Sequence, residues 1–90
     1  MDKLTPRDDM AVQIVFVRHG ESYGNAGLPN PDGYGKEDTP LTEYGIKQAD
    51  ALADYWFDDV EVAQIYASPF TRTIQTIYPT AVKLNKPIVL

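Results

Sequence analysis

An apolar run at residues 12–17 leads directly into the tripeptide Arg18-His19-Gly20. A short run rich in β-branched side chains is typical of a strand that is covered on both faces, as in a parallel sheet. In open α/β sheets, ligands bind beyond the carboxyl ends of the strands, so Arg18 and His19 stand where a reactive group is expected. His19 is also the only histidine of the chain. This segment therefore predicts an α/β fold with a functional site at the end of its first strand.

The stretch that follows predicts a long loop and then an amphipathic helix. Residues 26–40 are rich in Gly, Pro and Asp, which indicates a loop, and its length favours a substrate-facing flap over a passive excursion. Apolar residues at three-and-four spacing predict a helix over residues 43–57, with Thr42 as its N-cap. Gly45 is unfavourable within a helix, so we expect close packing, or tolerance of a glycine, in the first turn.

The C-terminal part of the chain predicts a strand, a helix and a strand in that order. Residues 62–67 are expected to form a second short strand, and Ser68-Pro69 is typical of an N-cap followed by a proline in the first helical turn. That helix is expected to end near Asn85, before a third strand over residues 88–90. The alternation of strands and helices predicts a mostly parallel sheet with flanking helices, in a three-layer α/β/α arrangement with right-handed crossovers.

The composition is that of an ordinary soluble domain with an acidic balance. The 90 residues include 43% hydrophobic and 23% charged side chains, and the net charge is −5 with no basic run. This balance argues against a nucleic-acid partner, and no segment is long and apolar enough to predict a membrane span. The absence of cysteine excludes disulfides and thiolate metal sites. Residues 1–11 are expected to be a flexible lead-in without the apolar core of a signal peptide, which favours a cytoplasmic location.

Three motifs follow one another along the chain. They are Arg18-His19-Gly20-Glu21-Ser22 with Asn25, then Thr39-Pro40-Leu41-Thr42 with Gly45, Gln48 and Ala49, and then Ser68-Pro69 with Arg72, Gln75 and Thr76. In their order and spacing they resemble the N-terminal part of the histidine phosphatase superfamily, also called the phosphoglycerate mutase-like family. Because members of that family are generally much longer, the resemblance implies that residues 12–90 are the N-terminal half of such an α/β domain.

The side chains of these motifs suit phosphoryl transfer. A neutral imidazole is a competent nucleophile when one ring nitrogen is held protonated and the other is free to attack, a role that His19 can fill. Guanidinium groups neutralise phosphate oxygens with paired hydrogen bonds, which makes Arg18 and Arg72 candidates for a phosphate pocket. Arg72 also lies in the first turn of a predicted helix, where free backbone amides favour an anion. Asn25 can donate an amide hydrogen bond to the same phosphate.

The resemblance implies a role for each of these residues. His19 is the residue phosphorylated on a ring nitrogen; the phosphate is bound by Arg18, Arg72 and Asn25; and Ser22 is a further candidate for substrate contact. The family also uses an acid that protonates the leaving oxygen and a second pocket histidine, and both are expected outside this chain. No metal or cofactor is implied, because the arginines supply the charge that a metal would otherwise provide.

Structural explanations compete with these catalytic ones. A single histidine near a strand end is more often a structural residue whose ring nitrogens find hydrogen-bond partners within the fold. An arginine on a helix surface is usually paired with an acid. The surrounding motifs favour functional roles for His19 and Arg72 over these explanations. Four other polar side chains of the motifs are expected to be architectural: Glu21, Gln48, Gln75 and Thr76.

Two classes of function remain open at this point. The aromatic Gly-Trp pattern that phosphoglycerate mutases usually show before the Leu-Thr motif is missing, which favours a phosphatase acting on a phosphorylated small molecule or phosphoprotein over mutase-type transfer. The alternative class is a non-catalytic phosphate-binding or interaction module, in particular if the natural chain ends at Leu90. The 90 residues alone are expected to self-associate through sheet edges and apolar faces, and to be inactive without the acid and the second histidine.

Overall fold

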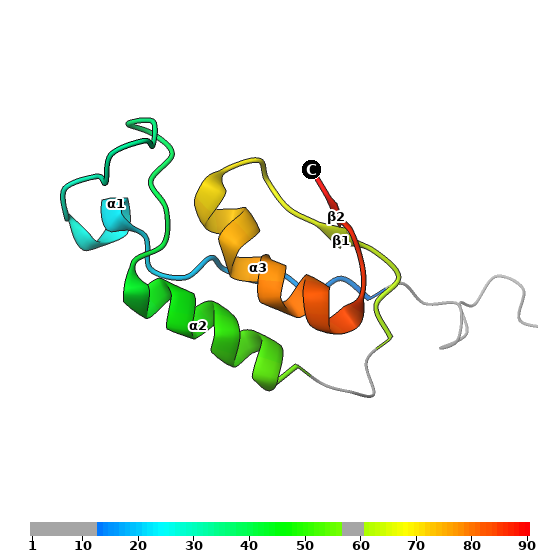
Figure 1. Cartoon of the computed structure of the whole chain (residues 1–90). Helices are drawn as coiled ribbons and strands as arrows, with labels where there is room; N and C mark the ends of the chain where they lie inside the picture. Colours follow the sequence, from blue (N-terminus) through cyan, green and yellow to red (C-terminus); the bar gives the residue numbers. More distant parts are fainter. Residues whose placement is uncertain (1–12, 57–60) are drawn as a thin grey trace, which may run out of the picture.

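The computed structural model of the protein describes residues 13–56 and 61–90 (Figure 1). The elements in chain order are helix α1 (Tyr23–Ala26), helix α2 (Glu43–Asp54), strand β1 (Ile65–Tyr66), helix α3 (Thr71–Leu84) and strand β2 (Ile88–Val89). The flexible lead-in expected at residues 1–11 lies outside the described residues. Within the described ranges, no helix is both long enough and apolar enough to cross a membrane.

The sheet consists of β1 and β2, which run parallel to each other with α3 as the crossover between them. Ile65 pairs with Ile88, and Tyr66 pairs with Val89. Parallel neighbours require a crossover of this kind, because a tight turn can join only antiparallel strands. The α/β class and the parallel direction of the sheet are therefore confirmed, although β1 is shorter than the strand expected at residues 62–67.

Helix α3 lies between the sheet and α2, as Figure 1 shows. The buried apolar side chains of the two helices are small, namely Ala49 and Ala53 on α2 and Ala81 on α3. Ile65 of β1 and Leu41, which precedes α2, are also buried. Small side chains let the helix backbones approach closely, but they bury little apolar area. The core of the described residues is therefore thin, as expected for a short chain.

Helix α2 begins at the N-cap expected from the sequence. The hydroxyl oxygen of Thr42 accepts a hydrogen bond from the Gly45 amide at 3.1 Å, which satisfies one of the free amides of the first turn. A methyl group at Gly45 would overlap the carbonyl oxygen of Glu21, so the close packing expected at this glycine is confirmed. The helix ends at Asp54, and Phe57, the last residue of the predicted helix, lies outside the described residues.

Helix α3 begins later than the sequence predicts, and the expected N-cap at Ser68 is wrong. The helix starts at Thr71, and the N-cap position is occupied by Phe70, whose side chain makes no capping hydrogen bond. The Ser68 hydroxyl is instead 2.8 Å from the hydroxyl of Thr73. The first amide of the helix, that of Thr71, donates to Asp38 Oδ1 at 2.6 Å. A carboxylate from a distant loop therefore replaces the local serine cap.

The C-terminal end of α3 agrees with the sequence. Asn85 is the C-cap, in the left-handed conformation with φ 54°, and its amide donates to helix carbonyls. Asparagine tolerates this conformation better than most residues, which explains why the helix ends here. Pro79 lies inside the helix, which continues to Leu84.

The strand predicted at residues 12–17 is not found in the described part of this segment, residues 13–17. Phe16 is 90% exposed and Ile14 is 71% exposed, so the expectation that both faces are covered is wrong. A strand requires a neighbour that satisfies its backbone hydrogen bonds. The only strand ladder of the described residues joins β1 to β2 and does not reach this segment.

Candidate active site

His19 is half-buried and follows this segment, and within the described residues its ring makes one hydrogen-bond contact. The Nδ1 atom lies 2.7 Å from the carbonyl oxygen of Gly20. Because a carbonyl oxygen only accepts hydrogen bonds, this contact requires a proton on Nδ1. In the neutral ring the lone pair is then on Nε2, which is the tautomer that a nucleophilic imidazole needs.

The backbone that follows His19 is held by side chains from both long helices. The Gly20 amide donates to the hydroxyl of Thr76 on α3 at 3.0 Å, and the Glu21 amide donates to Gln48 Oε1 on α2 at 2.8 Å. Two consecutive amides are thus fixed by two different helices. The architectural roles expected for Thr76 and Gln48 are confirmed.

The Leu-Thr motif packs against the same backbone. The Thr42 amide donates to the carbonyl of Glu21 at 2.9 Å, and the Thr42 hydroxyl donates to the carboxylate of Glu21, also at 2.9 Å. The Leu41 amide donates to Gln75 Oε1 of α3 at 2.7 Å. Glu21 and Gln75 are therefore structural hydrogen-bonding residues, as expected.

Ser22 and Asn25 form a capping box around α1, a short helix that the sequence did not predict. The backbone amide of Asn25 donates to Ser22 Oγ at 3.2 Å, and the side-chain oxygen Oδ1 of Asn25 accepts from the Ser22 hydroxyl at 2.8 Å. Ser22 is only 2% exposed, whereas Asn25 is exposed. The Ser-x-x-Asn spacing resembles a capping box and was the available signal for this helix. Because Oδ1 already accepts from Ser22, the part of the Asn25 side chain left for a ligand is the NH2 group, which is a hydrogen-bond donor.

Arg72 is the second residue of α3 and lies one helical turn before Thr76. The Thr76 hydroxyl that accepts from Gly20 also donates to the Arg72 carbonyl at 2.7 Å, so the start of α3 is connected to the backbone beside His19. The Arg72 guanidinium donates to the carbonyl of Glu37 at 3.3 Å. Its central carbon also lies 4.2 Å from the ring centroid of Phe70.

Arg18 is not brought into this network. Its side chain is exposed and makes no hydrogen bond or ion pair with any residue of the ranges 13–56 and 61–90. The convergence of both arginines on one phosphate therefore stays a prediction. The described residues also contain no group of three or more His, Cys, Asp or Glu side chains that could hold a metal ion.

Asp38 is a residue that the motif analysis missed. It lies in the loop predicted over residues 26–40, which begins one residue later because Ala26 ends α1, and its carboxylate accepts from both the amide and the hydroxyl of Thr71, at 2.6 and 2.7 Å. The hydrogen bond from the Thr71 amide, which has the largest effect, and the one from the Thr71 hydroxyl hold the pKa of Asp38 below its ordinary value of 3.8. The positive charge of Arg72 acts in the same direction. The loop thus meets α3 at the turn that carries Arg72.

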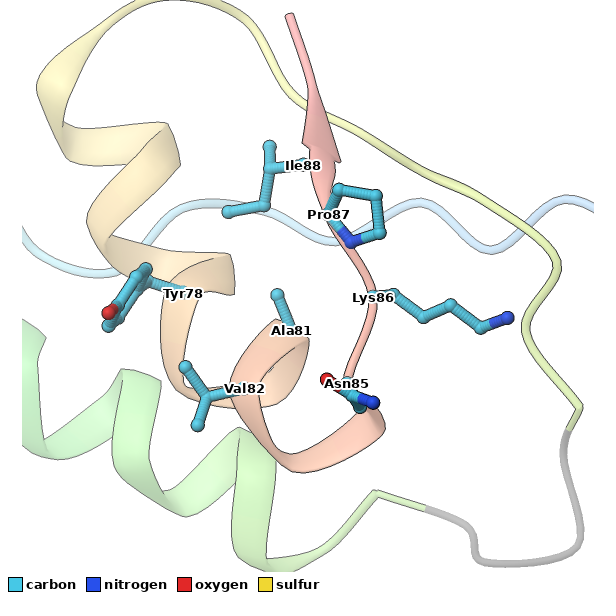
Figure 2. A pocket seen from close by; sticks show the side chains of 7 residues that line it. All are labelled: Tyr78, Ala81, Val82, Asn85, Lys86, Pro87 and Ile88. Atoms are coloured by element: carbon cyan, nitrogen blue, oxygen red, sulfur yellow. The ribbon is translucent and has the colours of Figure 1, made fainter.

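An open hollow of about 420 Å³ lies elsewhere, at the other end of α3 (Figure 2). It is lined by residues from the end of α3 and the start of β2: Tyr78, Ala81, Val82, Asn85, Lys86, Pro87 and Ile88. None of the expected site residues lines it, and the Lys86 side chain points away from Ala81 and Ile88 in the view of Figure 2. The hollow is therefore separate from the candidate active site.

Residues 14–90 match the model of the histidine phosphatase superfamily (branch 1), and the chain belongs to this family. It is 36% identical over 88 residues to the transcription factor tau 55 kDa subunit of Saccharomyces cerevisiae, a match that covers 90% of this chain and 20% of the yeast protein. It is 38% identical over 65 residues to the probable phosphoglycerate mutase GpmB of Yersinia pestis, covering 72% of this chain and 28% of GpmB.

A structural likeness supports the same assignment. The solved structure of a protein named Mycobacterial hydrolase 1 superposes with a TM-score of 0.63 at 25% sequence identity, covering 79% of this chain and 31% of that chain. The chain thus spans 20%, 28% and 31% of the lengths of these three proteins. The family and the α/β fold class expected from the sequence motifs are confirmed.

Proposed function

We propose that the histidine phosphatase domain to which these residues belong hydrolyses phosphomonoesters through a phosphohistidine at His19. The observation that carries this proposal is the 2.7 Å contact between His19 Nδ1 and the Gly20 carbonyl. With the proton on Nδ1, the lone pair of Nε2 attacks phosphorus, a nitrogen–phosphorus bond forms, and the bond from phosphorus to the leaving oxygen breaks. Water then attacks the phosphorus, the nitrogen–phosphorus bond breaks, and the Nε2 lone pair is restored as inorganic phosphate leaves; the proton lost by the water balances the one taken up by the departing alcohol oxygen.

In this proposal Arg18, Arg72 and Asn25 bind the phosphoryl oxygens. Arg72 is supported by its place in the first turn of α3, which Thr76 connects to the Gly20 backbone. Arg18 is supported by its position next to His19 and by its exposed side chain, which can turn toward a bound phosphate. Such cations matter most where negative charge develops in the transition state.

The choice of hydrolysis over mutase-type transfer rests on the stretch before the Leu-Thr motif. That stretch reads Glu37-Asp38-Thr39-Pro40 and lacks the aromatic Gly-Trp pattern of phosphoglycerate mutases. The similarity to a probable phosphoglycerate mutase supports transfer instead. Both reactions use the same phosphohistidine, so they differ only in whether water or a second hydroxyl accepts the phosphoryl group.

A phosphate-binding or interaction module is the second candidate function. It is supported by the similarity to a transcription factor subunit, which extends over 90% of this chain. In such a module the pocket would bind phosphate without turnover.

A phosphoryl-transfer experiment with p-nitrophenyl phosphate distinguishes these candidates, because this leaving group departs without protonation by an acid. A phosphatase gives a burst of p-nitrophenolate followed by steady release of inorganic phosphate. A mutase gives a phosphoprotein that is stable in water and is rapidly discharged by an added phosphoglycerate. Binding of inorganic phosphate without any burst would contradict the proposed function and would favour the module.

A further inference from the structure

We propose that Asp38 is a positioning residue of the phosphate pocket, because its carboxylate fixes the first turn of α3 and with it the guanidinium of Arg72. This inference rests on the proposed function, since it assumes that Arg72 binds phosphate. It adds a residue, from the loop, that does not itself contact the substrate.

The first support is that Asp38 provides the side-chain cap of α3. Its two carboxylate oxygens accept from two donors of one residue, the Thr71 amide at 2.6 Å and the Thr71 hydroxyl at 2.7 Å. Phe70, at the N-cap position, makes no side-chain capping bond. The direction of the first turn therefore depends on a carboxylate that is 33 residues away along the chain.

The second support is that neighbouring residues of the loop hold neighbouring residues of the helix. Asp38 binds Thr71, and the carbonyl of Glu37 accepts from the Arg72 guanidinium at 3.3 Å. The Phe70 ring lies against the same guanidinium. Arg72 is thus held by a carbonyl and a ring whose positions both depend on how the loop meets the helix.

The loop is itself anchored on both sides of Asp38. The Asp38 amide donates to the carbonyl of Gly35 at 3.0 Å, which closes a turn before it. The Thr39 hydroxyl accepts from the Gly24 amide of α1 at 3.1 Å, and Thr39 is buried. The carboxylate is therefore presented to α3 by a fixed backbone, as positioning requires.

Charge and positioning predict opposite effects for the loss of this carboxylate. Asp38 is negative and lies close to Arg72, so its charge alone opposes the binding of phosphate. If charge were its only influence, removing the side chain would strengthen phosphate binding. If it positions Arg72, removing it weakens binding despite the lost repulsion, and an amide that keeps the hydrogen bonds preserves binding.

The test measures the dissociation constant of inorganic phosphate for the full chain by NMR titration, at a temperature where every variant is folded. Asp38→Ala is expected to weaken binding by about fivefold or more, because a hydrogen-bonded support of Arg72 is lost. Asp38→Asn keeps an acceptor for the Thr71 amide and is expected to bind at least as tightly as the natural protein. Asp32→Ala, which removes an exposed acid from the same loop, is the matched control and is expected to change nothing.

The outcomes distinguish failure of the proposed phosphate pocket from failure of the positioning role of Asp38. If the natural protein binds no phosphate, the proposed pocket is wrong and the inference that rests on it is wrong as well. If the natural protein binds phosphate and Asp38→Ala binds equally or more tightly, the pocket stands and the positioning role is refuted. A lowered melting temperature of Asp38→Ala with an unchanged dissociation constant would also refute it, because that result describes a cap that serves stability alone.

Discussion

The Gly20 amide and the Thr76 hydroxyl, 56 residues apart in sequence, are joined by a hydrogen bond of 3.0 Å. The same hydroxyl donates to the Arg72 carbonyl at 2.7 Å. One threonine thus connects the backbone next to His19 with the helical turn that carries Arg72. This connection is the physical link between the first and third motifs of the chain.

Thr76→Val is expected to destabilise the protein by about 1 to 3 kcal/mol, because the half-buried Gly20 amide loses its acceptor. The measurement is the free energy of unfolding from urea titration. Thr80→Val is the matched control, since Thr80 is one turn further along α3, is 1% exposed, and has a hydroxyl that finds no hydrogen-bond partner among residues 13–56 and 61–90. The control is expected to be neutral or stabilising. Equal destabilisation by both variants would show that the Gly20 contact contributes nothing.

The Asp38 carboxylate is expected to make stability depend on pH. Its pKa is lowered in the folded state. Between the folded and unfolded pKa values the unfolded chain therefore binds more protons than the folded protein, and stability rises with pH. The contribution is fully present above the unfolded pKa of 3.8 and is lost as the pH falls through the lower folded value. Urea titrations should therefore show the difference between the natural protein and Asp38→Asn shrinking as the pH is lowered. A difference that is the same at every pH would contradict the ionised cap.

Arg72→Ala is expected to slow the burst of p-nitrophenolate by about 10²- to 10³-fold, because a pocket cation that stabilises transition-state charge is removed. Lys47→Ala on α2 removes one exposed positive charge outside the proposed pocket and is the matched control. Stopped-flow absorbance gives both rates. Small and equal losses in the two variants would remove Arg72 from the pocket.

Self-association is expected from the exposed apolar side chains of residues 14–17. Phe16 is 90% exposed and Ile14 is 71% exposed, and such contiguous apolar groups usually mark contact surfaces. Sedimentation equilibrium should show an average mass that rises with concentration, and Phe16→Glu should lower it. Tyr55→Glu, at an 83% exposed aromatic residue outside this segment, should have little effect. A mass of 10.1 kDa at every concentration would contradict the expectation.

The elements predicted correctly are those with local signals. Thr42 caps α2 and Asn85 ends α3, because capping depends on a few neighbouring residues. The parallel pairing of β1 and β2 follows from the alternation of strands and helices, which forces a crossover.

The incorrect predictions involve partners that are distant in sequence. Ser68 has the right chemistry for a cap, but Asp38 takes that place from another part of the chain. Residues 12–17 have the composition of a strand, but strand formation also requires a neighbour, and composition cannot supply one. For the candidate site, the motifs predict His19 and Arg72 as site residues, whereas the contacts that hold their surroundings are shown only by the structure.

The measurement that tests the central claim most directly is the identification of the phosphorylated nitrogen by NMR after reaction with p-nitrophenyl phosphate. Because His19 Nδ1 donates to the Gly20 carbonyl, the phosphoryl group is expected on Nε2, as an acid-labile adduct that is absent from His19→Ala. Couplings between phosphorus and the protons on the two ring carbons distinguish Nε2 from Nδ1. A phosphoryl group on Nδ1, or labelling of His19→Ala to the same extent as the natural protein, would contradict the account.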